Sequence, residues 1–277
     1  MTECVREATG FSGYPEYQGG TVDFYQGYKH LVVIAMQFLR KQGLQGPARV
    51  FGALSWEPIA SINAGFDIWN GKVAHFDKYG MNPTVLTDSE KLQAPTLLLH
   101  GRDGSQGMFT ALGAYFKKNQ MGPLFSVNLA DGELTEEDFD VVDQKIKEIS
   151  ALYGEEVKIN IIGYSRGAEL ALYMALPKDN WWIEEGGKCY LSPATRWRTE
   201  IGKVIRIGSM TLLSEWKMLS EEMKESIYEI RGKDDIHMPE PSYALNQYEV
   251  DGVGHVGLVS SSDVFDKLKV ILDNSST

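Results

Sequence analysis

A serine stands at the centre of a glycine-bounded turn, Gly163-Tyr164-Ser165-Arg166-Gly167. An apolar stretch at 157–162 comes directly before it and a helical pattern follows, which is typical of a serine exposed on a sharp strand-to-helix turn. Side chains in place of the two glycines would collide with the neighbouring strand and helix, and the start of the helix stabilises negative charge nearby. The pattern predicts a nucleophilic serine; the alternative is a chance glycine-rich turn.

A serine hydroxyl is a weak nucleophile and needs a base, which is itself oriented by an acid. Downstream of Ser165 the sequence contains two histidines, His237 and His255. His255 lies in the glycine-rich segment 251–257, after a predicted strand and before the last predicted helix. We therefore expect His255 to be the base, and the alternative is a capping or turn histidine.

Two adjacent aspartates, Asp234 and Asp235, follow a predicted strand at 226–231. We assign Asp234 as the acid that orients the base, with Asp235 as the alternative, otherwise a solvated loop carboxylate. His237 beside this pair raises the question of a metal site, but one histidine and two adjacent carboxylates are a weak ligand set. We expect neither a metal nor a cofactor.

Negative charge that develops during attack on a carbonyl group needs backbone N–H donors. One donor is expected from Arg166, the residue after the serine, because it opens the helix. The second is expected from Arg102, in the segment 100–104 that follows a predicted strand. His100 in this segment is interpreted as structural.

From residue 93 onward, short apolar runs alternate with amphipathic helical patterns. Strands are predicted at about 96–100, 124–129, 157–162, 204–207, 226–231 and 247–250, and helices at about 106–119, 135–152, 166–174 and 262–273. This alternation predicts an α/β fold with a mostly parallel sheet flanked by helices on both faces.

Two segments do not fit this alternation. The segment 1–92 contains one convincing helical pattern, at 21–42, and is predicted to be a cap-like accessory segment packed on a core of residues 93–277. The stretch 177–202 is predicted to be an insertion in that core. Its Trp181 and Trp182 are candidates for binding substrate, and the alternative is that they fill a core between an accessory layer and the sheet.

The overall composition restricts the classes of partner. The 277 residues include 27 Lys and Arg against 38 Asp and Glu, a net charge of −11, which disfavours nucleic acid and anionic bilayers as partners. Cys4 and Cys189 are too few for a disulfide scaffold. Residues 1–20 lack a signal-peptide pattern, and no apolar run approaches the ~20 residues of a membrane span. We expect a cytoplasmic protein by default, with signal-independent export left open; the oligomeric state is not indicated.

From about residue 94 to 273 the sequence resembles the α/β-hydrolase superfamily, and it is most similar to small bacterial triacylglycerol lipases. The segment 99–105 resembles their His-Gly-x-Gly-Gly oxyanion segment, and 252–258 is similar to their Gly-Val-Gly-His-Ile-Gly-Leu segment, which carries the catalytic histidine. Their acid, at Asp-x-Ile, corresponds to Asp234. The resemblance implies a serine hydrolase that cleaves small-molecule or lipid carboxylic esters through an acyl-enzyme on Ser165.

The sequence departs from those lipases beside the predicted site. Arg102 and Asp103 stand where the family has small or apolar residues, and Arg166 stands where it usually has Met. Arginine side chains directed into the site would favour an ester that carries a phosphate or carboxylate. The alternative is that both point outward and pair with Asp103 or Glu169. Those lipases are also secreted, and they have no counterpart of residues 1–92 or 177–202.

Two other functions are weighed against ester hydrolysis. An acyltransferase would use the same three residues while an alcohol or amine excludes water as the acceptor. A non-catalytic binding protein would keep only the fold, but drift would have little reason to spare the serine, the aspartate and the histidine together.

Overall fold

The fold is described from a computed structural model. It describes residues 39, 41–43, 81–154, 156–184, 188–209, 212–235, 237 and 242–273. The predicted helix at 21–42 lies almost wholly outside these residues, and so does most of the segment 1–92. The accessory, cap-like role of that segment therefore stays a prediction.

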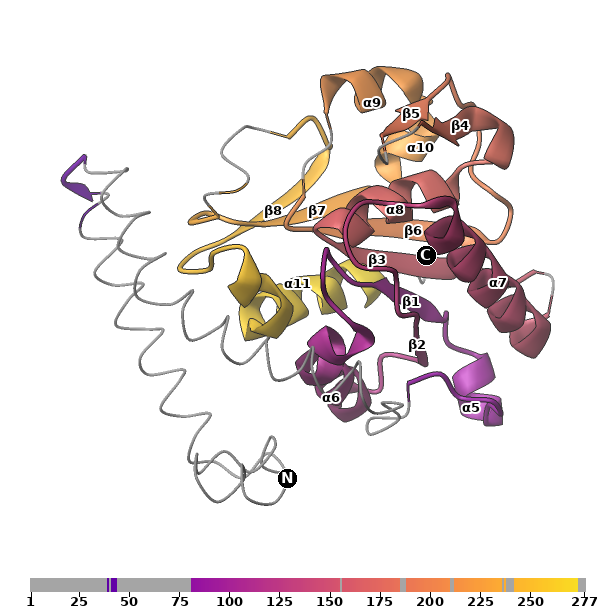
Figure 1. The fold of residues 1–277 in the computed structure, drawn as a ribbon. Coiled ribbons are helices and arrows are strands. Elements are labelled where there is room, and N and C mark those ends of the chain that lie inside the picture. The colour runs from indigo at the N-terminus through magenta and orange to yellow at the C-terminus, as the bar shows by residue number, and fades with distance from the viewer. Residues whose placement is uncertain are drawn as a thin grey trace, which may run out of the picture.

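A six-stranded sheet forms the centre of the described chain, in the order β2-β1-β3-β6-β7-β8 (Figure 1). Its strands are β1 (Thr96–Leu99), β2 (Leu124–Ser126), β3 (Ile159–Tyr164), β6 (Ile201–Ile207), β7 (Ile227–Gly232) and β8 (Asn246–Val250). Every neighbouring pair in the sheet is parallel. The carboxyl ends of all six strands consequently meet at one edge.

Helices cover both faces of this sheet (Figure 1). The longer ones are α6 (Thr110–Asn119), α7 (Glu136–Tyr153), α8 (Arg166–Ala175) and α11 (Ser262–Asp273), and the shorter ones are α5 (Asp88–Lys91), α9 (Leu213–Met218) and α10 (Glu221–Glu225). Single 3-10 turns lie at η1 (Gln106–Phe109), η2 (Lys178–Asn180) and η3 (Val256–Ser260). Helices α7 and α8 pack on one face, and α6 and α11 pack on the other.

The central strands are buried on both faces. In β1, Leu97 packs toward α7 and α8 while Leu98 packs toward α6 and α11. Ile161 and Ile162 divide in the same way on β3, and all four side chains are fully buried. This two-sided burial explains why the strands read as continuous apolar runs in the sequence.

Helix α7 shows how local signals and packing agree. Thr135 and Asp138 form a capping box, and three acidic residues occupy the first turn, where the helix dipole favours negative charge. The helix buries the apolar residues Phe139, Val142, Ile146 and Ile149. Gly154 ends it with φ 105°, a backbone conformation that favours glycine.

The stretch 177–202 contains a small antiparallel sheet separate from the central one, and its last two residues belong to β6. The small sheet consists of β4 (Trp181–Ile183) and β5 (Cys189–Leu191). The Trp181 ring packs on Phe139 of α7, with 4.3 Å between ring centroids. This hairpin is therefore attached to the face of the molecule that α7 and α8 cover.

All the strands and helices predicted from residue 93 onward are present, with ends shifted by a few residues. The region 106–119 begins as the turn η1 rather than as an α-helix. Helices α9 and α10 between β6 and β7 were not predicted, because five or six residues are too few to show a 3.6-residue period. Within the described ranges, no helix combines the length and apolar character needed to cross a membrane.

Helix α8 begins in unusually close contact with the sheet. A Cβ atom at Gly163 would lie 2.2 Å from the carbonyl oxygen of Gly167. A Cβ atom at Gly167 would lie 2.3 Å from the carbonyl oxygen of Leu99 on β1. Both glycines are thus required by backbone packing, as the sequence pattern predicted.

We expect Gly167→Ala to lower the free energy of unfolding by about 1–3 kcal/mol, because the added methyl group overlaps backbone that cannot move aside. Gly202→Ala is the control, since its methyl group would meet mainly the side-chain oxygen of Asn160 at 3.0 Å. Chemical denaturation measures both variants. Equal losses would contradict the explanation based on backbone overlap.

Candidate active site

Ser165 occupies a strained turn between β3 and α8. Its backbone has φ 52° and ψ −122°, a positive φ that is rare outside glycine. Its N–H donates to the carbonyl oxygen of Ile207 on β6 (2.9 Å), and its own carbonyl accepts from Ala168 (2.8 Å). These bonds hold the serine at the carboxyl edge of the sheet.

His255 connects Ser165 to an aspartate. Its Nε2 lies 3.0 Å from the Oγ of Ser165, and its Nδ1 lies 2.8 Å from the Oδ2 of Asp235. A neutral imidazole that donates from Nδ1 to the carboxylate leaves Nε2 bare to accept the serine proton. The structure therefore brings together the serine and histidine that the sequence singled out.

The carboxylate in this arrangement is Asp235, so the assignment of the acid to Asp234 is wrong in this geometry. Asp234 points elsewhere, and its Oδ2 accepts from the N–H of Gly252 (3.0 Å). Both side chains are almost fully buried, so Asp235 is not the solvated loop residue considered above. Adjacent side chains leave the end of β7 in different directions, and only one of them reaches the histidine.

The segment that carries His255 is fitted closely over the strand ends. A Cβ atom at Gly232 would lie 2.0 Å from the carbonyl oxygen of Val253, and one at Gly208 would lie 3.2 Å from the His255 ring. The hydroxyl of Tyr164 donates to the carbonyl oxygen of His255 (3.2 Å). Backbone packing and this hydrogen bond together fix the position of the imidazole relative to the strand ends.

His237 lies beside His255, and the sequence did not assign it to the site. Its ring centroid is 5.1 Å from that of His255, and its backbone N–H donates to Oδ1 of Asp235 (2.9 Å). The Asp235 carboxylate thus contacts both histidines, the backbone N–H of His237 and the ring of His255. No group of three or more His, Cys, Asp or Glu residues in the described part of the chain is arranged to hold a metal ion.

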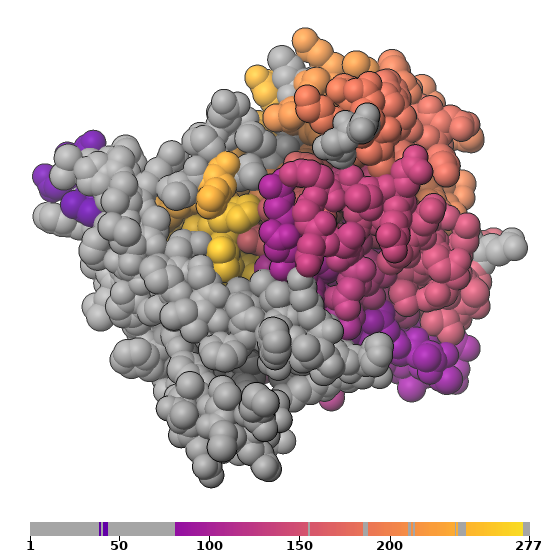
Figure 2. Space-filling model, in the orientation of Figure 1, coloured from indigo at the N-terminus to yellow at the C-terminus, as the bar shows by residue number. Residues whose placement is uncertain are grey.

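The segment 100–104, here called the oxyanion loop, lies against the serine. A Cβ atom at Gly101 would be 3.1 Å from the Cβ of Ser165. Figure 2 shows magenta atoms of the chain that follows β1 beside yellow atoms of the C-terminal segment, on one face of the molecule. The position of the loop is compatible with an N–H donor at Arg102, and Arg166 opens α8, where the first N–H groups lack helical partners. Their joint role as donors stays a prediction.

His100 joins two segments through its ring. Its ring is fully buried, with Nε2 accepting from the N–H of Leu129 (2.8 Å) and Nδ1 2.8 Å from the carbonyl oxygen of Gly101. Because Nε2 accepts, the proton is on Nδ1 and the ring is neutral. This geometry agrees with the structural role expected for His100.

Neither arginine side chain is directed toward Ser165. Arg102 pairs with Glu133 (2.5 Å), and both side chains are more than half exposed. The Arg166 guanidinium donates to carbonyl oxygens in the segment 130–133. The hypothesis of a binding site for anionic esters is therefore not supported. The outward-pointing alternative fits only Arg102, because Arg166 is buried, and neither arginine pairs with Asp103 or Glu169 in the contacts described.

The two tryptophans of the hairpin contact other parts of the molecule. Trp181 packs on Phe139, and Trp182 stacks on Tyr190 with 5.5 Å between ring centroids and 13° between planes. Trp181 thus contributes to the core beneath the hairpin, while Trp182 is about half exposed. These contacts favour the packing role over substrate binding.

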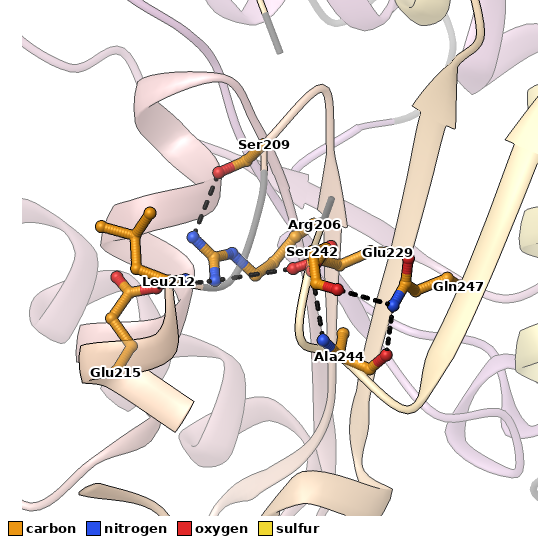
Figure 3. Close-up of polar contacts among 8 residues, drawn as sticks. All are labelled: Arg206, Ser209, Leu212, Glu215, Glu229, Ser242, Ala244 and Gln247. Atoms are coloured by element: carbon orange, nitrogen blue, oxygen red, sulfur yellow. Dashed lines mark hydrogen bonds and ion pairs between the residues drawn. The ribbon is translucent and has the colours of Figure 1, made fainter. Parts of the chain in front are cut away.

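A buried arginine at the end of β6 forms polar contacts with the segment that follows this strand (Figure 3). Arg206 donates from Nη2 to the Oγ of Ser209 (3.1 Å) and pairs through Nη1 with Glu215 (3.3 Å) and Glu229 (3.7 Å). Burial lowers the pKa of Arg206, but the two carboxylates outweigh it and hold that pKa above its usual value. The residue before Ser209 is Gly208, at which a Cβ atom would lie 3.2 Å from the His255 ring, so this network steadies one wall of the site.

Removal of the Asp234 carboxylate tests its role as an anchor. We expect Asp234→Ala to lower the free energy of unfolding by about 1–3 kcal/mol, because the buried N–H of Gly252 loses its acceptor. Asp234→Asn retains an acceptor oxygen and is expected to lose less. Asp251→Asn is the control, because its pair with Lys233 is partly exposed. Chemical denaturation measures all three variants. An equally large loss of unfolding free energy in the control would contradict the role of Asp234 as an anchor.

Comparisons with known proteins were made on both the sequence and the structure. No protein-family model and no curated protein matches the sequence. Among solved structures, the chain is similar to an α/β-hydrolase from a sediment metagenome of the Mar Chica lagoon in Morocco (16% identity, TM-score 0.42, covering 64% of this chain and 88% of that one). It is also similar to an esterase from Thermogutta terrifontis (14%, 0.43, 66% and 82%) and to a soluble variant of monoglyceride lipase from Saccharomyces cerevisiae (13%, 0.44, 70% and 90%).

Three features of the molecule itself define the fold class. The sheet is parallel with helices on both faces, the serine stands on a strained turn between strand and helix, and the serine, aspartate and histidine follow one another in that order along the chain. This combination characterises one architecture. The described part of the chain therefore has the α/β-hydrolase fold.

Proposed function

We propose that this protein is a serine hydrolase that cleaves carboxylic esters through an acyl-enzyme on Ser165. The observation that carries the proposal is the continuous chain from Ser165 Oγ through the His255 imidazole to the Asp235 carboxylate, at 3.0 and 2.8 Å. Such a chain raises the nucleophilicity of a hydroxyl that is otherwise unreactive at neutral pH.

In the acylation half-reaction, Ser165 Oγ attacks the carbonyl carbon of the ester while His255 Nε2 takes its proton. Asp235 stabilises the resulting imidazolium and keeps the ring oriented. The tetrahedral oxyanion accepts hydrogen bonds from the N–H groups of Arg102 and Arg166. When the intermediate collapses, the histidine protonates the departing alcohol and the acyl group stays on the serine.

In the second half-reaction, water replaces the alcohol. His255 removes a proton from the water as it attacks the acyl-enzyme, and the same N–H groups donate hydrogen bonds to the new oxyanion. Collapse of this intermediate returns the proton to Ser165 and releases the carboxylic acid. The substrate class is a small-molecule or lipid ester.

We expect a fluorophosphonate probe to label the wild-type protein and not Ser165→Ala, because only the activated serine attacks phosphorus. The same substitution is expected to abolish hydrolysis of nitrophenyl esters. Ser89→Ala is the matched control, since Ser89 is an exposed serine on the short helix α5. The proposal would be refuted by a folded wild-type protein that does not react with the probe and hydrolyses no ester of a chain-length series. Acyl transfer to added alcohols in preference to water would instead indicate a transferase.

We expect Asp235→Asn to lower kcat by about 10³–10⁴-fold, because an uncharged amide neither stabilises the imidazolium nor enforces the correct tautomer. Asp234→Asn provides the comparison, with the same chemical change one residue away, and is expected to lower kcat less than about tenfold. Steady-state hydrolysis of a nitrophenyl ester measures both. The reverse ranking would return the role of the acid to Asp234.

A further inference from the structure

The contacts of the Arg166 side chain are not those of a surface ion pair with a carboxylate. The residue is 6% exposed, and its guanidinium donates to three backbone carbonyl oxygens, those of Ala130 (2.6 Å), Gly132 (2.5 Å) and Glu133 (3.0 Å). Backbone carbonyls of a connecting segment are not fixed by a strand or helix ladder. Arg166 therefore fixes the course of the segment that links β2 to α7.

This segment, residues 129–133, in turn holds the oxyanion loop. Three of the five loop residues have a partner on it: Leu129 N–H donates to His100 Nε2 (2.8 Å), Arg102 Nη2 pairs with Glu133 Oε1 (2.5 Å), and Gly132 N–H donates to Asp103 Oδ1 (3.1 Å). Gly132 is central, because its carbonyl accepts from Arg166 while its N–H donates to Asp103. The peptide groups on both sides of this glycine are thereby fixed.

The backbone of the oxyanion loop needs such support. Asp103 has φ 54°, a conformation that non-glycine residues adopt only where their surroundings hold them in it. Its carboxylate is held by the N–H of Gly132. Release of that contact would let the backbone of Asp103 relax. The peptide group that joins Asp103 to Arg102 would turn, and this would displace the backbone that carries the N–H of Arg102.

We propose that the Arg166 guanidinium is a positioning group that keeps the N–H of Arg102 aimed at the oxyanion, acting through the segment 129–133. The inference rests on the proposed function. One residue then serves both halves of the donor pair: its own N–H is one donor, and its side chain orients the other. Donors placed before charge develops are what lower the barrier, since no reorganisation is then needed.

The chemistry of the side chain explains why an arginine stands after the nucleophile. A guanidinium is planar and carries five N–H donors, so it bonds several carbonyl oxygens at fixed angles. An ammonium group is compact and offers three donors from one nitrogen, and it does not span the same carbonyls. Methionine has no donor.

The test compares steady-state kinetics of Arg166→Met, Arg166→Lys and the wild-type protein on one short-chain nitrophenyl ester. Loss of an oxyanion donor lowers kcat by ~10²–10³-fold, and we expect a misdirected donor in Arg166→Met to lower kcat at least about tenfold. KM is expected to change less than about threefold, because the donor acts on the transition state. Arg166→Lys is expected to recover only part of the loss.

Arg198→Met is the matched control. Arg198 is also a poorly exposed arginine, and it pairs with Asp143 and Glu200, remote from Ser165 in its contacts. This variant is expected to lose stability and keep its kcat. A fall in kcat of equal size in Arg198→Met would mean that general destabilisation explains the effect, and it would overturn the inference.

Substitutions of Asp103 test the same series of contacts independently. They also serve if Arg166→Met does not fold. Asp103→Ala removes the acceptor for Gly132 N–H and is expected to reproduce the kcat defect. Asp103→Asn keeps an acceptor oxygen and tolerates positive φ, so it is expected to restore most of the activity. Equal activity of Asp103→Ala and wild type would overturn the inference.

Hydrogen exchange gives a readout that does not depend on turnover. In Arg166→Met the amides of Leu129 and Gly132 are expected to exchange faster than in wild type, while Arg198→Met leaves them unchanged. Unchanged exchange of these two amides in Arg166→Met would overturn the positioning role of Arg166 and would leave the proposed function standing. Absence of Ser165-dependent turnover in the wild type would refute the proposed function, and this inference with it, whereas an active wild type with an unimpaired Arg166→Met would refute only the positioning role.

Discussion

The site depends on one backbone constraint, the positive φ of Ser165 at the junction of β3 and α8. This turn directs the hydroxyl away from the sheet and brings the first turn of α8 down onto β1. The approach is so close that Gly163 and Gly167 cannot carry a Cβ atom. The strain is sustained because the turn is bonded on both sides, to Ile207 and to Ala168.

The parallel sheet converts this local turn into a site. Because all six strands end at the same edge, residues far apart in sequence meet there: Ser165 and His255 are 90 positions apart, and His255 and Asp235 are 20 apart. The segments that cross the edge come close because Gly232 and Gly208 have no side chains to obstruct the loop of His255. The geometry of the three residues is therefore set by the sheet and by glycine placement more than by the loops' own preferences.

The sequence predicted the parts of this arrangement that local pattern governs. Strand and helix periods placed the sheet, and the turn chemistry around Ser165 and His255 singled out two residues whose side chains the structure brings within 3.0 Å of each other. The choice between Asp234 and Asp235 depended on which way a side chain leaves the end of β7, and residue type contains no such information. The directions of Arg102 and Arg166 were equally inaccessible, because their partners lie about 30 residues away on a segment without regular structure.

Two buried guanidinium groups flank the site, and their burial has a consequence for catalysis. Removing a charged group from water is costly unless fixed partners replace the water. Arg166 finds them in three backbone carbonyls and Arg206 in two carboxylates and a hydroxyl. Any movement of these partners would leave a buried charge poorly paired, so the segment 129–133 and the residues Ser209 and Glu215 are held in place. In the proposed mechanism this stiffness is an advantage, since the donors then need no rearrangement when the charge of the oxyanion appears.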